Sequence, residues 1–369
     1  MNFQHIEPRP NLRALTGLRG VAALVVMLGH FNPALPYHLE HFFRWHTAAV
    51  DLFFYLSGFT LSYVYSGTSF RFAPYLTARV ARIYPLYFLT LVVVGAAFTL
   101  PSQVLRATYP AHSALSDFVR QVLMVNDWPI IGTGVHWNTQ AWSVSIEWLC
   151  YLLLFPLLLR LTPPRSENVK LLLFAALTAV SYVTLLFSET WLVNPVTNAV
   201  NAWRPWGNAL RGTSAFTAGW IAFWSFEQRD QLHSLCTRFS PALWLCFVAV
   251  LTLSYTAYIE PQMVVFLFPF IVLAASDSNS GPSRLLGARP LHFLGLISYS
   301  IYMVHFIVAI AFARIFGRWA GWSLWIHAAL IAATFAASVC SYILIERPAR
   351  DALRKWRIVP QAKGQMNPG

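Results

Sequence analysis

LRALTGLRGVAALVVMLGHF, residues 12–31, has the apolar composition of a membrane helix but carries Arg19 near its start and His30 near its end. At about 1.5 Å per residue, the two are separated by a rise of roughly 16 Å, about half a bilayer core. An ionisable group inside an apolar helix is costly unless the rest of the protein solvates it, which favours a functional role for both residues. Two alternatives are that both side chains only reach the membrane interfaces, or that the stretch is a signal peptide, although no small-residue cleavage site follows it.

Composition predicts a membrane protein. Hydrophobic residues make up 57% of the chain and charged residues 11%, whereas a soluble domain has about 25% charged residues. The net charge of +12 is compatible with nucleic-acid binding, but the basic residues are scattered over short loops, which membrane topology explains better. We therefore expect no nucleic-acid partner. The cysteines have no metal-ligand spacing, so we expect no metal and free thiols at Cys150, Cys236, Cys246 and Cys340.

Ten apolar stretches predict an all-α polytopic membrane protein with about ten transmembrane helices. They are Ala14–Phe31, Thr47–Ser66, Ile83–Leu100, Ala141–Leu161, Leu171–Phe187, Pro205–Ser225, Pro241–Tyr258, Pro261–Ala275, Leu291–Ala313 and Gly321–Ile345. Most of the 26 Lys and Arg residues fall on the inner side when both termini are cytoplasmic, and the positive-inside rule therefore favours that topology. We expect one membrane domain over residues 1–348 and a flexible basic cytoplasmic tail over residues 349–369.

This topology brings several ionisable side chains toward one layer in the outer half of the membrane. They are His30, Asp51, Glu147, Arg211 and His305, and they come from different spans. A single intramembrane histidine is often only hydrogen-bonded to a neighbouring helix. Several such groups at one depth favour a shared site instead.

A second layer of charged residues lies at the cytoplasmic face. Arg79 and Arg82 are three residues apart and share one face if their segment is helical. Arg19 is close to them in depth, and Glu346 is placed to hold one of these arginines. One interpretation is a positive-inside anchor. The other is a guanidinium clamp for the phosphates of an anionic ligand, which arginine geometry suits.

Five local patterns, taken in order, resemble the integral-membrane acyltransferase 3 family over residues 12–348. They are LTGLRGVAALVVMLGH, AVDLFFYLSGF, RVARIYPLYF, WNTQAWSVSIEWLCYLLLFP, and LGLISYSIYMVH with IERP near the end. The family's arginine–histidine spacing, paired arginines and Trp-Ser-x3-Glu pattern fall, in that order, on Arg19 with His30, Arg79 with Arg82, and Ser143 with Glu147. The chain departs from the family in WHTAAV before Asp51, where a glycine is expected, and His46 is left as an additional imidazole.

The resemblance implies transfer of an acyl group, commonly acetyl from acetyl-CoA, to a sugar hydroxyl of an envelope glycan, exopolysaccharide or glycolipid. It also implies a place in the bacterial inner membrane, with the lipid bilayer, a glycan or lipid-linked saccharide acceptor and polysaccharide biosynthesis proteins as partners. Some family members modify small molecules, and many carry a fused soluble domain after the last span. Only a short tail follows IERP here, so we expect the chain to act alone or with a separate partner.

The residue pattern and the resemblance together assign catalytic roles. The donor's phosphates are expected to bind three arginines, Arg19, Arg79 and Arg82. His30 is expected to take the proton from the acceptor hydroxyl, because an imidazole titrates near neutrality. Asp51 or Glu147 is expected to orient the ring. A covalent acyl-histidine intermediate is left open as an alternative route.

Further side chains are expected around the acceptor. They are Trp142, Asn138, Arg211, Tyr299 and His305, and Ser143 joins Trp142 and Asn138 as a candidate to stabilise the oxyanion. Ser57 and Gly58 are expected to allow close helix packing. Two other function classes compete with the enzyme: a glycolipid or small-molecule transporter without covalent chemistry, and a non-catalytic partner of a polysaccharide synthase. A transporter would move its substrate unchanged and would need no CoA donor.

Overall fold

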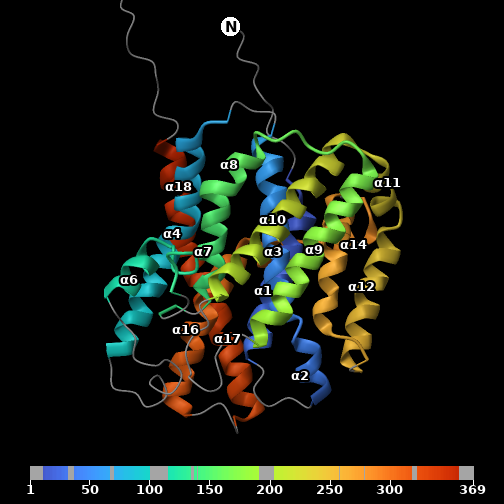
Figure 1. The fold of residues 1–369 in the computed structure, drawn as a ribbon. Helices are drawn as coiled ribbons and strands as arrows, with labels where there is room; N and C mark the ends of the chain where they lie inside the picture. Colours follow the sequence, from blue (N-terminus) through green and yellow to red (C-terminus); the bar gives the residue numbers. More distant parts are fainter. Residues whose placement is uncertain are drawn as a thin grey trace, which may run out of the picture.

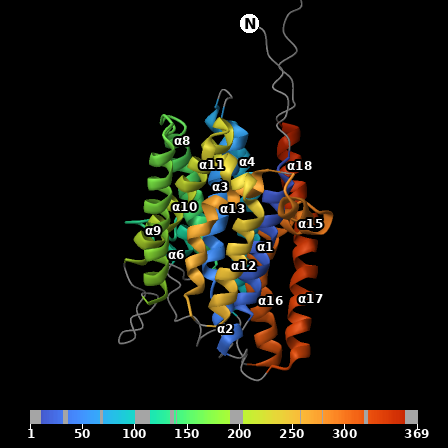
Figure 2. The same ribbon diagram turned by 90° about the vertical axis from the view of Figure 1, so that its right-hand side faces the viewer.

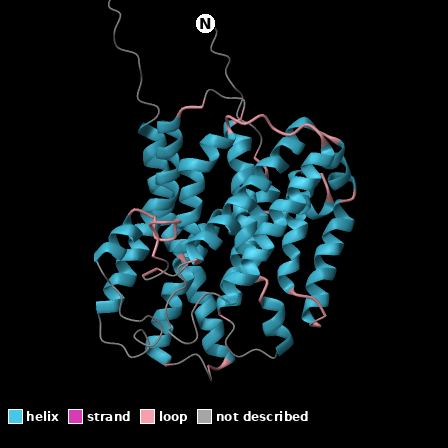
Figure 3. Cartoon of the chain, viewed as in Figure 1, coloured by secondary structure: helices cyan, strands magenta, loops and turns pink. Residues whose placement is uncertain are grey.

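The computed structural model describes residues 11–31, 37–66, 70–99, 115–133, 137–138, 140–190, 203–256, 258–277, 279–317 and 322–356. Every regular element in these ranges is a helix, and Figure 3 shows the helices gathered into one bundle. The expected all-α fold is confirmed. Residues 357–369 of the expected tail lie outside the described ranges.

Six helical segments in the described ranges are long and apolar enough to cross a membrane. They are Glu40–Tyr65, Phe72–Ala96, Ala141–Leu158, Glu167–Phe187, Ser298–Phe316 and Leu324–Ala352. A seventh candidate is the pair Gln231–Arg238 and Ser240–Tyr255, bent by 71°. The expected ten spans are therefore not confirmed. Helices α1 (Arg13–His30) and α10 (Arg204–Gln228) contain arginines that lower their hydropathy, and the apolar helix Pro261–Ser276 is short.

Helices α1, α3 (His46–Tyr65) and α10 lie at the centre of the bundle, as Figure 1 shows. Glycines allow α3 and α10 to approach closely. A Cβ on Gly58 would lie 2.0 Å from the carbonyl oxygen of Phe216, and one on Gly219 would lie 2.1 Å from that of Tyr55. Small residues let two helices pack closely in a membrane, where van der Waals contact drives their association. The expected packing role of Gly58 is confirmed.

Three more helices surround this centre: α4 (Phe72–Thr99), α7 (Ala141–Leu149) and α16 (Ser298–Phe316). Helix α7 continues through a π-helical turn, η1 (Cys150–Leu154), into α8 (Phe155–Leu158). The stretch Leu291–Ala313, expected as one span, is divided in the structure. Helix α15 (Arg289–Leu296) ends before Ile297, and α16 begins directly after it. The break brings the first turn of α16 to the cavity described below.

The other described helices are α2 (Tyr37–Phe43), α6 (Leu115–Val122), α9 (Glu167–Thr190), α11 (Gln231–Arg238), α12 (Ser240–Tyr255), the 3-10 helix η2 (Pro261–Leu267), α13 (Phe268–Ser276), α14 (Gly281–Leu286), α17 (Leu324–Ser341), the π-helical turn η3 (Tyr342–Glu346) and α18 (Arg347–Trp356). Figure 2 shows α9 and α17 on opposite sides of the bundle. Helix α18 contacts α4. The first part of the expected flexible tail is therefore helical, because it continues α17 and η3 along the bundle.

Cysteine labelling tests which end of the bundle faces the cytoplasm. The turn before α9 lies at the upper end of Figure 1 and the end of α12 at the lower end. Tyr258→Cys, at a site with 82% exposure, should react with an impermeant thiol reagent in intact cells, and Ser166→Cys only after the membrane is opened. Cys246 and Cys340 are first changed to Ser, because both are exposed free thiols and the other two native thiols are buried. Labelling of Ser166→Cys from outside would show the inverted topology.

Candidate active site

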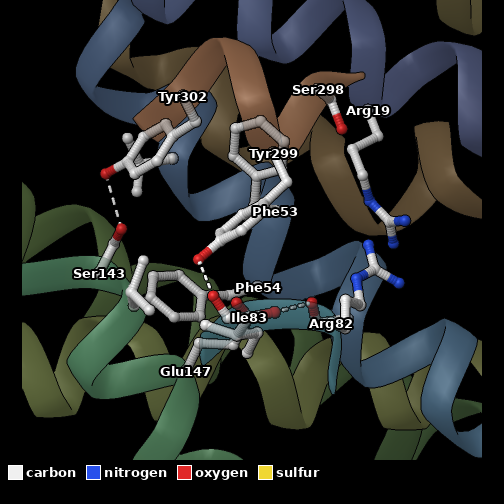
Figure 4. Close-up of a pocket in the computed structure, with 13 residues that line it drawn as sticks. Arg19, Phe53, Phe54, Arg82, Ile83, Ser143, Glu147, Ser298, Tyr299 and Tyr302 are labelled. Carbon is white, nitrogen blue, oxygen red and sulfur yellow. Dashed lines mark hydrogen bonds between the residues drawn. The ribbon is translucent and has the colours of Figure 1, made fainter. Parts of the chain in front are cut away.

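One cavity lies between α1, α3, α4, α7 and α16. Its volume is about 60 Å³, room for a few water molecules, and Figure 4 shows its lining. The polar residues in its walls are Arg19, Ser57, Arg82, Ser143, Glu147, Ser298, Tyr299 and Tyr302. Residues far apart in the sequence therefore meet here, and several of them are site residues that the sequence predicts.

Glu147 lies in this cavity with Arg19 and Arg82, and not beside the histidines. Its Oε1 atom accepts hydrogen bonds from Ser57 Oγ at 2.7 Å and from the Tyr151 hydroxyl at 2.5 Å. The expected place of Glu147 in the same layer as the imidazoles is therefore wrong. The reason is that α7 begins inside the bundle. Gln140, directly before α7, is buried, and its side chain donates to a backbone carbonyl of α16. Counting depth from an outer loop places the carboxylate too far out.

Arg79 and Arg82 lie on one helix, α4, as their spacing predicts. Arg82 lines the cavity, and Figure 4 shows its guanidinium group next to that of Arg19. Arg79 lies instead between the rings of Tyr65 and Tyr151, 5.9 and 5.8 Å from their centroids. Arg19 and Arg82 therefore place two positive charges next to each other at this end of the cavity.

Ser143 and Tyr302 lie at the other end of the cavity, joined by a hydrogen bond of 2.6 Å that Figure 4 shows. The Tyr302 hydroxyl donates its proton to the carbonyl oxygen of Gln140 at 2.9 Å. Ser143 Oγ also lies 3.4 Å from that carbonyl oxygen, so either hydroxyl can be the donor in the bond between Ser143 and Tyr302. The Tyr302 ring centroid lies 6.0 Å from that of His305. This end of the cavity therefore borders a cluster of histidines.

Three histidine rings meet at the C-terminal end of α1. The ring centroid of His30 lies 5.0 Å from that of His46 and 5.1 Å from that of His305. His30 is exposed, His46 is half-buried and His305 is fully buried. The structure thus brings His30 and His305 together, as their depths predict, and adds His46 to them. We call these three residues the histidine cluster.

Backbone carbonyls determine which nitrogen of each ring carries the proton. The Nδ1 atoms face carbonyl oxygens in three contacts: His30 with Val26 at 2.8 Å, His46 with Phe43 at 2.6 Å, and His305 with Ile301 at 3.1 Å. A carbonyl oxygen only accepts, so Nδ1 donates in each ring and the neutral ring keeps a lone pair on Nε2. An imidazole in this tautomer can act as a general base through Nε2.

Asp51 is paired with Arg211 of α10 and not with a histidine. Its two oxygens accept hydrogen bonds from Arg211 Nε at 2.6 Å and Nη2 at 3.0 Å. Nη2 also donates to the carbonyl oxygen of Thr47, and the guanidinium group lies 5.1 Å from the Trp142 ring centroid. Both charged side chains are buried. The carboxylate that we expected beside the base is therefore not found: among the described residues, Asp51 bonds to Arg211.

Removing Asp51 should destabilise the protein, because Arg211 would remain as an uncompensated buried charge. Asp51→Ala is expected to lower the free energy of unfolding by roughly 3–5 kcal/mol, measured as thermal denaturation of the detergent-purified protein. The double variant Asp51→Ala/Arg211→Met should be less destabilised than the sum of the two single variants. Additive losses would show that the two side chains do not act as a pair.

The sequence profile of the acyltransferase 3 family, described as an acyltransferase domain, matches residues 12–344. The chain belongs to this family. It is 27% identical over 386 residues to Acyltransferase MdmB of Streptomyces mycarofaciens, a match that covers 95% of each protein. It is 23% identical to Peptidoglycan O-acetyltransferase OatA of Listeria monocytogenes and 24% identical to O-acetyltransferase OatA of Staphylococcus aureus. These two matches cover 93% and 99% of this chain but 56% and 62% of the relatives. No solved structure matches the chain.

Some predicted site residues of this acyltransferase have structural partners. Asn138 is buried and outside the cavity lining, and its Nδ2 atom donates to a threonine of α4 at 3.0 Å. Tyr299 lines the cavity, but its hydroxyl donates to the carbonyl oxygen of Ile83 at 2.7 Å. Glu346 faces Arg350 at 3.6 Å, so it forms its ion pair with a different arginine from the ones we expected.

Sequence reasoning missed several residues of the site. Tyr302 precedes His305 by three residues and Tyr151 follows Glu147 by four, so helical spacing alone places each tyrosine beside a residue that we had identified. Ser57 was interpreted as a packing residue, but it donates to Glu147 in the cavity. The two tyrosines can be identified as site residues from the sequence only after His305 and Glu147, their neighbours on the same helix, have been identified.

Proposed function

We propose that this chain transfers an acyl group, acetyl from acetyl-CoA, to a sugar hydroxyl of an envelope glycan or glycolipid, with His30 as the general base. One observation carries the proposal. A single cavity has two arginines at one end and, at the other, Tyr302, whose ring lies against His305 of the histidine cluster. Groups suited to an anionic donor and groups suited to accept a proton therefore lie along one path.

The arginine end suits the phosphates of CoA. Planar guanidinium groups bind phosphate oxygens through paired, charge-assisted hydrogen bonds. Arg19 and Arg82 offer such groups to the cavity, and the Nε atom of Arg79 is buried without a hydrogen-bond partner in the described part of the chain. Along α1, Arg19 and His30 are about 16 Å apart, and the linear pantetheine arm of CoA is suited to connect two such points.

Proton transfer at His30 begins the proposed reaction. Nε2 of the neutral ring takes the proton of the acceptor hydroxyl while the hydroxyl oxygen bonds to the thioester carbonyl carbon. The C–S bond then breaks, and the CoA thiolate leaves with the proton that Nε2 returns to it. The ring ends neutral, as it began. The bond from Nδ1 to the Val26 carbonyl supports this role because it keeps Nε2 unprotonated beforehand.

The relatives and the exposure of His30 support a large saccharide as the acceptor. The relative from Listeria is named as acting on peptidoglycan, and the relative from Staphylococcus is named as an O-acetyltransferase. His30 is exposed at the end of α1, so an acceptor can reach it without entering the cavity. A glycan in the bacterial envelope, approached from the inner membrane, fits both observations.

Transfer of label from donor to glycan tests the proposal. Purified protein is incubated with acetyl-CoA that is radiolabelled in its acetyl group and with native envelope extract, and the labelled product is identified by mass spectrometry. The expected product is an alkali-labile ester on the glycan fraction. Unchanged glycolipid that crosses the membrane of sealed vesicles, with no label attached, would favour the transporter instead.

A further inference from the structure

We propose that His46 is a positioning residue for His30: its neutral imidazole takes the place of a carboxylate and stabilises the imidazolium that forms when His30 accepts a proton. The inference rests on the proposed function and deepens it, because it names the partner of the base. His46 itself exchanges no proton in this scheme, so the atom and charge balance of the transfer is unchanged.

The first support is the close packing of the His46 ring against the backbone of α1. A Cβ on Gly29 would lie 2.3 Å from Cγ of His46, so only a glycine lets the ring approach the backbone next to His30. In this position the His46 ring packs edge-on with the His30 ring, with ring centroids 5.0 Å apart and ring planes at 73°. The contact therefore depends on a glycine directly before the base.

The second support is the tautomer of His46. Its Nδ1 atom donates to the carbonyl oxygen of Phe43 at 2.6 Å, which leaves the lone pair on Nε2. A lone pair attracts a positive charge that forms on the neighbouring ring. In the usual arrangement a carboxylate supplies this attraction. Here Asp51 is occupied by Arg211, and Glu147 lies in the cavity with the arginines.

The third support is the way the start of α3 is held. Arg211 donates to the carbonyl oxygen of Thr47, the residue after His46, and to both oxygens of Asp51 one turn later. The buried ion pair therefore fixes the first turn of α3, which carries the His46 ring. The ring centroid of His305 also lies 5.1 Å from that of His30, and its own Nδ1 is bonded to a carbonyl, so two such rings contact the base.

Two substitutions of His46 separate this role from simple packing. Phe keeps a flat ring against Gly29 but has no nitrogen, whereas Gln can place its amide oxygen near the position of Nε2. We expect His46→Phe to lower kcat about 10-fold, equivalent to roughly 1.4 kcal/mol in the barrier. His46→Gln should retain most of kcat, and the KM values for acetyl-CoA and for envelope extract should change little in both variants. CoA binding by calorimetry shows that each variant is folded.

Which of the two variants keeps the higher kcat decides between positioning and simple packing. If the ring serves only for packing, Phe will be tolerated and Gln will not, which would overturn the proposal, as would equal losses in both variants. Gly29→Ala, which displaces the ring, should resemble His46→Phe in kcat, and wild-type turnover in Gly29→Ala would also contradict the proposal. If wild-type protein transfers no acyl group from acetyl-CoA, the proposed function itself fails, and this outcome is distinct from every result with the variants.

Discussion

Replacing His30 by alanine should reduce acyl transfer by a factor of about 10² to 10⁴, the usual loss for a positioned general base. The physical reason is that His30 is the exposed residue of the histidine cluster, whereas His46 is half-buried and His305 is fully buried. The measurement is turnover of labelled acetyl-CoA at saturating donor. Expression and membrane insertion should stay near wild type, because the ring is exposed and its one hydrogen bond among the described residues is to a carbonyl of its own helix.

His327 provides a matched control for this experiment. Its Nδ1 atom also faces the carbonyl oxygen four residues earlier, Ser323, at 3.1 Å, but it lies on α17 and outside the cavity and the histidine cluster. His327→Ala should therefore keep wild-type turnover. If His30→Ala stays within a few-fold of wild type, His30 is not the base, and His305→Ala becomes the next variant to measure.

The sequence predicts the helical class, the family and which residues share one helix, because each is a property of composition or of spacing along the chain. Arg19 and His30 are placed correctly on α1, and Arg79 and Arg82 on α4, since a single helix fixes their separation. The number of spans is harder to predict. Helices α1 and α10 pack inside the bundle, where arginines are tolerated, so hydropathy alone does not separate a buried helix from a membrane span.

The sequence does not determine which side chains on different helices bond to each other. Glu147 and Asp51 both appear at the depth of the imidazoles when residues are counted from the loops. The structure places Glu147 with Ser57 because α7 begins inside the bundle, and it pairs Asp51 with Arg211 across the α3–α10 contact. Which carboxylate meets which cation depends on helix rotation and on close glycine contacts, and neither follows from one sequence without an assembled bundle.

Arg82 should contribute more to donor binding than Arg79, because Arg82 faces the cavity and Arg79 is enclosed by two tyrosine rings. A charge-assisted contact to phosphate contributes about 1.5–3 kcal/mol. Arg82→Ala should therefore weaken CoA binding by roughly 10- to 100-fold, measured by calorimetry on detergent-purified protein. Arg82→Lys should restore only part of the affinity, because a lysine has no planar fork.

The variant Arg160→Ala distinguishes the loss of a local phosphate contact from a general loss of positive charge. It is exposed directly after α8 and does not line the cavity, so Arg160→Ala removes the same charge without touching the expected phosphate site. Its CoA affinity should equal that of wild type, and Arg79→Ala should fall between Arg160→Ala and Arg82→Ala. The half-saturating concentration of envelope extract should stay unchanged in all three variants, because the acceptor is expected at His30. Equal CoA affinity in Arg82→Ala and wild type would show that this arginine only anchors α4 in the membrane and would remove the phosphate-binding end from the proposed path.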